Sequence, residues 1–549
     1  MRTQPQRRIP SDRVMRTVSA AWPAILLASL ITLPFLGKAH TIDDVTFLLQ
    51  AKHVLTDPLH PAAFEMLSDH NRIRVSNQLV SGPVMAYLLV PSMLLNGAEW
   101  AAHLVQYLLL IGAILATVSL AFRLGMDGPS ARVAGLILAS TPVVTAMATT
   151  SMPDVASMAF GATGMERFVA WTGERKWHQG FLASVCFAFA ALSRPHLILL
   201  LAAAAVALSR HPMPTLRARL QTPKAWQLLI PLIFAGLITL AAAIGTADPA
   251  AAHGDFIQAV ISRFQPTSTA SNTAAFFLHW SLVFPLTLLW LTMGVRRWNL
   301  WRNPALYAAL ALTFFIRNLD KGSQKVPQSV LFLAFIGAFV LLDILLDSWE
   351  RRDNAQLLLW VWLLISLPAI AYVQFPSKYL VGSAPAVAVL LAGVWMRSGR
   401  LRHVIPWVAV SAGVVLGLLI VAADARFAAI GKTIAADQIA PRVRQGTRVW
   451  INSEWGFEWY ALKAGAVPAT NQPPYPAPGD LLVSSSAAPH LPLDRFPNRK
   501  LVAEFRESSR FGQIMNHSAA VGFYSNAYGY FPWTWRNGEI EAVTIWEIR

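Results

Sequence analysis

The chain has 549 residues, of which 55% are hydrophobic and only 13% are charged, and its formal net charge is +16. Soluble domains carry about 25% charged residues, so this composition excludes a soluble protein and predicts an integral membrane protein with many spans. The basic residues stand in short clusters between apolar runs, which is typical of membrane-orienting loops and not of a nucleic-acid-binding surface. The single cysteine, Cys186, excludes an intrachain disulfide and a cysteine-based metal site.

The first apolar segment, Val18–Leu36, is long enough to cross a bilayer. Arginines crowd the residues before it, and no small-residue cleavage site follows it, so we interpret it as an uncleaved first span. Positively charged flanks remain in the cytoplasm. The sequence therefore predicts a cytoplasmic N-terminus and a first outer loop over residues 37–98.

Two adjacent carboxylates, Asp43 and Asp44, stand just beyond this span. The apolar residues Phe47, Leu48 and Ala51 follow at helical spacing, which predicts a short interfacial helix with the acidic pair at its N-terminus. Free N–H groups and the helix dipole keep a carboxylate ionised there, and an ionised carboxylate beside a bilayer can serve as a base. The alternative is that one of the two residues only caps the helix.

Further apolar segments recur as far as Val404–Ala422 and predict about 13 spans of roughly 20 residues each. Pro83–Leu95 is short and is interrupted by a proline, so we expect a second interfacial helix there. We expect Val133–Thr149 to cross outward as one span and Glu166-Arg167 to open a charged inner loop. The inner loops collect most of the arginine, in agreement with this topology.

The composition changes after Asp424, and short apolar or alternating runs then predict strands. These strands are expected at Arg448–Asn452, Asp480–Ser484, Lys500–Phe505 and Ala542–Ile548, with a helix over Glu454–Gly465. We therefore expect a transmembrane domain over residues 1–423 and a small α/β domain over residues 424–549. An odd number of spans places the second domain outside.

With this topology, ionisable residues from separate parts of the chain meet on the outer rim. They are Asp43, Asp44, Asp154, Arg194, Arg317, Lys325 and Lys378. Carboxylates that face cations at a bilayer edge suit a phosphate-bearing lipid and a hydroxyl group, because the cations neutralise the phosphate and a carboxylate accepts the hydroxyl proton. The alternative for Asp154 and Arg194 is an ion pair that only stabilises helix packing.

No motif for another chemistry accompanies these residues. The histidines lack a helical His/Glu metal pattern, and the chain has neither a Gly-rich phosphate loop with a lysine nor a Gly-x-Ser-x-Gly elbow. We therefore predict no metal site, no cofactor and no nucleic-acid partner. Whether the reaction depends on a divalent metal ion is left open by the sequence.

Several of these stretches also carry a family resemblance. Asp43-Asp44 with the following helix, Gly82-Pro83-Val84, Pro153-Asp154, Ser193-Arg194-Pro195 and Lys378-Tyr379 are similar to motifs of the GT-C superfamily. Its members are polytopic glycosyltransferases that use polyprenyl-phosphate sugars, among them lipid A aminoarabinose transferases and protein O-mannosyltransferases. The resemblance implies a GT-C fold, with the catalytic carboxylate at Asp43, Asp44 next to it, and the second acidic motif at Asp154.

The resemblance also bears on the lipid phosphate. Some relatives hold it with a lysine just before the motif that opens the second interfacial helix, but here that position is Ser81. The candidates for holding the phosphate are therefore four basic residues, Arg72, Arg74, Arg194 and Lys378. We favour Arg194 and Lys378.

The function implied is an inverting transfer of a sugar from a polyprenyl-phosphate donor to an acceptor hydroxyl, at the outer face of a bacterial inner membrane. Asp43 is the expected base, and Asp154 orients the acceptor or supports the site. The expected partners are the donor, membrane lipids and a glycan, lipid or protein acceptor, and the C-terminal domain is expected to be periplasmic.

The alternative function is that of a transporter or flippase, which would place ionisable residues near the bilayer midplane in two related halves. A non-catalytic scaffold would tolerate loss of the outer carboxylates.

Overall fold

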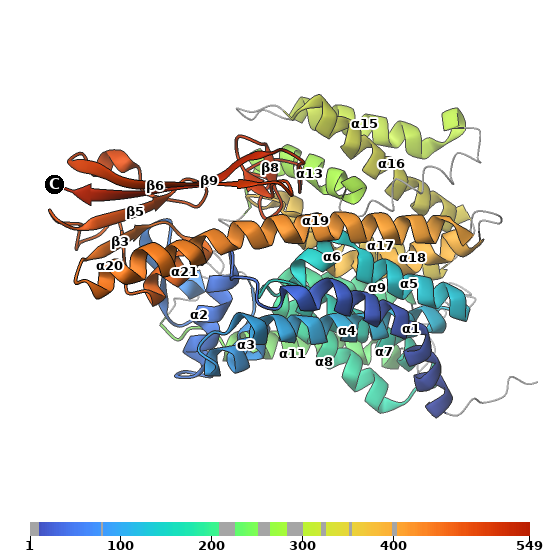
Figure 1. The fold of residues 1–549 in the computed structure, drawn as a ribbon. Coiled ribbons are helices and arrows are strands. Elements are labelled where there is room, and N and C mark those ends of the chain that lie inside the picture. The colour runs from blue at the N-terminus through green and yellow to red at the C-terminus, as the bar shows by residue number, and fades with distance from the viewer. Residues whose placement is uncertain are drawn as a thin grey trace, which may run out of the picture.

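The computed structural model describes residues 10–77, 81–207, 226–250, 264–282, 300–319, 326–350, 354–397 and 403–549. Within these ranges the chain is mostly helical and carries a β-sheet near its C-terminus (Figure 1). The predicted fold class, a polytopic helical protein with a small C-terminal α/β domain, is therefore confirmed. Lys325 lies outside the described residues.

Six helical segments in the described part of the chain are long and apolar enough to cross a membrane. They are residues Arg13–Phe35, Glu99–Arg123, Gln227–Gly245, Gln328–Glu350, Ser377–Met396 and Ile405–Arg444. The chain is accordingly a multi-pass membrane protein, while the expected total of about 13 spans stays a prediction.

The main α-helices of these six segments are α1 Pro10–Thr32, α4 Glu99–Arg123, α11 Ile230–Gly245, α16 Gln328–Glu350, α18 Ala384–Arg397 and α19 Ile405–Ile434. Other helices complete the bundle: α5 Gly128–Ser140, α6 Pro142–Met147, α7 Asp154–Glu174, α8 Trp177–Ser193, α9 Leu200–Ala207, α13 Thr269–Leu282, α15 Pro304–Leu319 and α17 Asn354–Leu363. Helix α7, which begins at Asp154, packs against both α4 and α8.

Two expectations for this region are wrong in detail. The span expected over Val133–Thr149 is broken between α5 and α6, because Pro142 lacks an N–H and Thr141 before it adopts an extended conformation. The inner loop expected at Glu166-Arg167 is instead a continuation of α7 to Glu174. Glu166 remains in the bundle because Arg123 forms an ion pair with it.

The loop that follows the first span, called the first outer loop after its predicted side, contains a helix at each of the two places where the sequence predicts one. These helices are α2, Asp44–Val54, and α3, Val84–Leu94, and they pack against each other. Between them an antiparallel hairpin joins β1, Glu65–Ser68, to β2, Asn71–Arg74.

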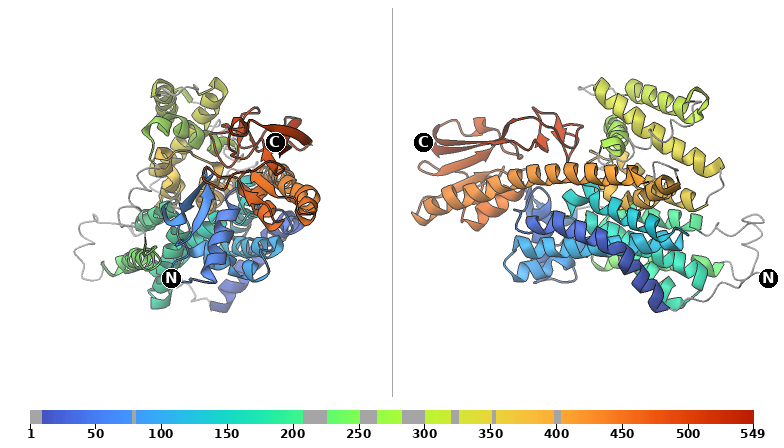
Figure 2. Two further views of the ribbon diagram at one scale, coloured as in Figure 1. Left: turned by 90° about the vertical axis from the view of Figure 1, so that its left-hand side faces the viewer. Right: turned by 45° about the vertical axis from the view of Figure 1, so that its right-hand side comes forward.

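The C-terminal region begins from α19, which runs along the helical body and points toward the strands (Figures 1 and 2). This helix passes through the expected domain boundary at 423/424 without a break. A π-helical turn, Ala435–Ile439, and α20, Ala440–Arg444, follow it. In Figure 2 the strands lie at the opposite end of the molecule from the start of α1.

Five strands form the C-terminal sheet in the order β4-β3-β5-β9-β6. Their bounds are β3 Val449–Asn452, β4 Val467–Pro468, β5 Leu481–Ser485, β6 Arg499–Ser509 and β9 Gly538–Ile548, and α21, Trp455–Lys463, follows β3. Strand β3 pairs in parallel with β4 and β5, whereas β9 is antiparallel to both β5 and β6. A smaller pair joins β7, Met515–Asn516, to β8, Val521–Gly522. The hydrophobic core is continuous from the bundle into this domain, since Phe457, Val483 and Ile545 belong to it.

Candidate active site

A cavity of about 380 Å³ lies between the first outer loop, the helix ends at Arg194 and Lys378, and the start of α21. It brings together segments that are more than 300 residues apart in the sequence. Its polar and aromatic lining is Asp43, Thr46, Phe47, Ser68, Ser81, Arg194, Tyr372, Gln374, Lys378, Tyr379, Glu454, Trp455 and Glu458. Three of the seven predicted catalytic or phosphate-binding residues therefore share one cavity.

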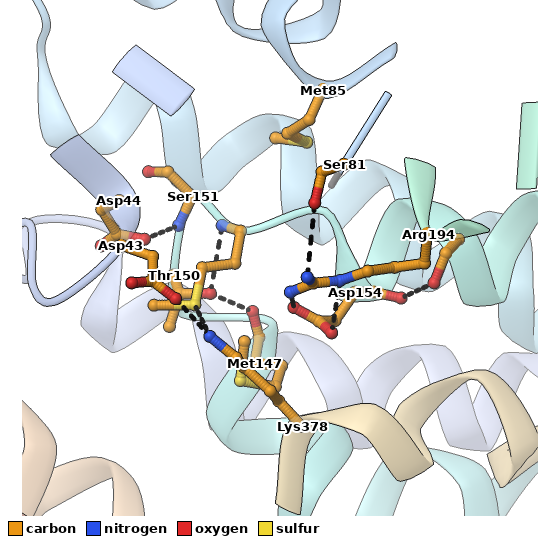
Figure 3. A network of polar contacts seen from close by, with 12 residues as sticks. Asp43, Asp44, Ser81, Met85, Met147, Thr150, Ser151, Asp154, Arg194 and Lys378 are labelled. Carbon is orange, nitrogen blue, oxygen red and sulfur yellow. Dashed lines mark hydrogen bonds and ion pairs between the residues drawn. The ribbon is translucent and has the colours of Figure 1, made fainter. Parts of the chain in front are cut away.

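Asp43 precedes α2 directly and faces this cavity. Its side chain is 47% exposed and makes no capping hydrogen bond to the helix, so the capping alternative is wrong for this residue. Instead its carboxylate forms an ion pair with Lys378, which lies in the 3-10 helix Ser377–Ser383 (Figure 3). Lys378 is buried, and its Nζ also lies 3.6 Å from the sulfur of Met152.

Asp44 is adjacent in sequence but lies in a different environment. It is fully buried, and its carboxylate accepts hydrogen bonds from the backbone N–H groups of Thr41, at 2.9 Å, and Ser151, at 2.6 Å. Burial raises the pKa of Asp44 to about 7, and the nearby Lys38 and these N–H groups oppose that rise only in part. Burial thus opposes the ionisation that the helix N-terminus is expected to favour at Asp44. Its side chain ties the outer loop to the turn before α7.

Asp154 and Arg194 form a bidentate ion pair at the ends of α7 and α8. Arg194 donates from Nε to Asp154 Oδ1 at 3.0 Å and from Nη2 to Oδ2 at 2.7 Å. Its Nη1 points toward Ser81 Oγ at 3.4 Å, and its guanidinium lies 5.5 Å from the centre of the Tyr379 ring (Figure 3). Only Arg194 lines the cavity, so Asp154 acts through Arg194 and holds it in place.

The other basic candidates lie elsewhere. Arg74 forms an ion pair with Asp248, and Arg72 is an exposed residue of β2. Arg317 belongs to α15. None of the three lines the cavity described above. The described residues thus leave Arg194 and Lys378, the two favoured candidates, as the cations next to Asp43.

The C-terminal domain contributes a wall that the sequence did not predict. Glu454 and Glu458 are one helical turn apart and both face the cavity, with Trp455 beside them. Trp455 has a φ of 67°, in the left-handed region that is costly for such a side chain. Burial, and next the negative charge of Glu454, raise the pKa of Glu458 to about 8. The available sequence signal was the spacing of two glutamates around a tryptophan.

Comparison with known proteins gives one family match, to part of the chain. Residues 80–243 match the family model described as dolichyl-phosphate-mannose-protein mannosyltransferase. A comparison with curated proteins gave no match.

Several solved structures are similar to the chain. ArnT from Cupriavidus metallidurans bound to undecaprenyl phosphate is 16% identical, with 88% of this chain and 96% of that chain covered and a TM-score of 0.47. Arabinofuranosyltransferase AftD from Mycobacteria is 12% identical, with coverages of 97% and 40% and a TM-score of 0.39. Arabinosyltransferase EmbB from Mycobacterium smegmatis is 15% identical, with coverages of 81% and 44% and a TM-score of 0.37. The family match over residues 80–243 confirms the predicted resemblance to protein O-mannosyltransferases for this part of the chain.

Proposed function

We propose that this protein transfers a sugar from a polyprenyl-phosphate donor to an acceptor hydroxyl, with inversion at the anomeric carbon. The observation that carries the proposal is the shared cavity, which a half-exposed carboxylate, Asp43, lines together with two cations, the buried Lys378 and the partly buried Arg194. The carboxylate is suited to accept a proton, and the cations are suited to a phosphate leaving group.

In the proposed reaction the acceptor oxygen attacks the anomeric carbon of the donor and gives its proton to Asp43. The bond between that carbon and the phosphate oxygen breaks in the same step, which inverts the anomeric centre. The donor phosphodiester carries one negative charge, and the departing polyprenyl phosphate carries two. The step therefore neutralises a charge at Asp43 and creates one at the phosphate.

The ion pair between Lys378 and Asp43 links these two changes. When Asp43 accepts the proton, the ammonium group of Lys378 loses its partner charge and becomes available to the phosphate that is leaving. A buried ammonium exerts a stronger electrostatic effect than an exposed one, because water screens it less. Lys378 thus couples proton transfer to departure of the phosphate.

Arg194 is the second cation for the phosphate. Asp154 fixes two of its donor positions, and the remaining Nη1 edge is directed toward the cavity-lining Ser81. A guanidinium held in this way needs no reorientation when charge develops on the leaving group. Asp154 is accordingly a positioning residue in this mechanism.

We further propose that the site faces the periplasm of a bacterial inner membrane. Arginines precede α1, while the cavity with Asp43 lies past the other end of that helix. Positively charged ends remain cytoplasmic, which supports an outer location for the cavity and for the C-terminal domain.

The test is reconstitution of the purified protein in liposomes with radiolabelled polyprenyl-phosphate sugars, scoring which donor is consumed. D43N should lower transfer by at least about 100-fold, since a general base contributes roughly that much. D69N is the matched control, because Asp69 lies in the same outer loop outside the cavity and asparagine tolerates its φ of 49°. Wild-type turnover by D43N would refute the role of Asp43.

A further inference from the structure

A second group of ionisable side chains lies near Asp43 in the fold but does not line the cavity. His40 precedes α2, Asp44 begins it, and His103 lies in the second turn of α4. One ligand atom from each of these side chains lies within 4.8 Å of those from the other two. All three residues are buried, so the cluster is shielded from solvent.

The hydrogen bonds of the two histidines determine which nitrogen carries a lone pair. His103 Nδ1 lies 2.8 Å from the carbonyl oxygen of Leu36. A carbonyl only accepts, so Nδ1 is the donor and Nε2 is left with its lone pair. That Nε2 is buried and has no hydrogen-bond partner among the described residues.

His40 follows the same pattern. Its Nε2 lies 3.3 Å from the carbonyl oxygen of Gly97, so Nε2 donates and Nδ1 keeps the lone pair. Nδ1 lies 3.5 Å from the hydroxyl of Ser151, the residue whose N–H binds Asp44. Imidazole that donates one N–H to a backbone carbonyl and offers its other nitrogen is the usual arrangement of a metal-ligating histidine.

Asp44 supplies the third ligand. Each of its oxygens accepts one backbone N–H bond, and a carboxylate oxygen has room for a second interaction. The neighbouring cation, Lys38, is directed elsewhere, to Asp424 and to the carbonyl oxygen of Thr149. Two imidazole rings and a carboxylate therefore meet in a buried space, with one ligand atom of each within 4.8 Å of the others. Polar atoms buried without a partner are costly, and a cation would offset that cost.

We propose that His40, Asp44 and His103 bind one divalent transition-metal ion, with zinc as the first candidate. Two imidazole nitrogens and one carboxylate oxygen are a donor set that zinc commonly uses, with a fourth position for water or a hydroxyl such as that of Ser151. The ion would fasten the first outer loop to α4 and to the turn before α7. It thereby fixes the N-terminus of α2 and the position of Asp43, without touching the reacting atoms.

The experiment measures metal content in the full-length protein, purified in detergent without chelator, by mass spectrometry. About one zinc ion per chain is expected in the wild type, and its removal by a chelator should lower the melting temperature, which added zinc should restore. H40Q and H103Q should lose the ion. H103C should keep it, because cysteine is also a zinc ligand.

H279Q is the matched control. His279 is also buried, with one ring nitrogen 3.1 Å from the carbonyl oxygen of Tyr530 and the other without a partner among the described residues, but it lies outside this cluster. It should keep the zinc. A wild type that carries no metal and is not stabilised by added zinc would overturn the proposal, whatever the variants do, and so would an H103Q variant that folds and retains the ion.

Discussion

Arg194 and Asp154 meet through two parallel hydrogen bonds, of 3.0 and 2.7 Å, that join the end of α8 to the start of α7. Removing one partner of such a buried pair leaves a charge without compensation, whereas replacing both by apolar residues of similar volume is often tolerated. Variants of this pair can therefore distinguish an effect on the stability of the fold from an effect on the reaction in the cavity.

We expect D154A to lower the free energy of unfolding by about 3–5 kcal/mol, and the double variant D154L/R194M to recover most of that loss. The double variant should still fail to transfer sugar, because the cation for the leaving phosphate is gone. Thermal unfolding in detergent and the liposome assay measure the two effects. A double variant as unstable as D154A would show that the pair does not act as a unit.

Lys378 should matter to the rate through its charge. K378M is expected to lower kcat/KM by about 100-fold or more, which is typical when one preorganised electrostatic donor is lost. The double variant D43N/K378M should lose little more than either single variant, because residues that act in one step are not additive. K463M supplies the control: Lys463 binds the carbonyl oxygen of Asn96, near the same outer loop but outside the cavity.

Glu458 predicts a specific dependence of stability on pH. Its pKa is raised from 4.5 to about 8 in the folded protein, mainly by burial and then by Glu454. Between these values the unfolded chain releases the proton while the folded chain keeps it, so this group lowers stability progressively as pH rises from about 4.5 to 8, and no further above that.

E458Q removes this contribution. The difference in melting temperature between E458Q and the wild type should therefore become more favourable to E458Q as the pH rises from 5 to 8. E507Q, at an exposed glutamate of β6 that pairs with Arg426, is the control and should show a nearly constant difference. A flat difference for E458Q across the same range would contradict the raised pKa.

Gly82 is expected to be sensitive to a single methyl group. A Cβ at this position would overlap the backbone carbonyl of Leu192, where the start of α3 meets α8. G82A should therefore destabilise the protein by about 1–3 kcal/mol, the usual effect of overpacking. G37A, where a Cβ meets nothing within 4 Å, should change stability by less than about 0.5 kcal/mol.

The sequence was informative where local pattern decides the structure. Asp43-Asp44 followed by apolar residues at helical spacing predicted α2 and its N-terminus, and the apolar runs after Asp424 predicted β3, β5, β6 and β9. These features depend on neighbours in the chain, so composition and periodicity reveal them.

Environment could not be predicted in the same way. Asp43 and Asp44 are neighbours with similar chemistry, yet one is half exposed beside Lys378 and the other is buried against Ser151. Similarly, Glu458 enters the cavity wall from more than 400 residues beyond Asp43 in the sequence. Tertiary packing sets both outcomes, and no local pattern encodes it.

The uninterrupted course of α19 has a consequence for the wall of the cavity. In its second half, one carboxylate oxygen of Asp424 binds both Lys38, as an ion pair, and Tyr524, whose hydroxyl donates at 2.7 Å. Because α19 is unbroken across residue 424 and contacts both the first loop and the C-terminal domain there, this part of the helix ties the two regions to the bundle. The cavity wall formed by Glu454 and Glu458 should therefore keep its place relative to the helices, whether or not the cavity is filled.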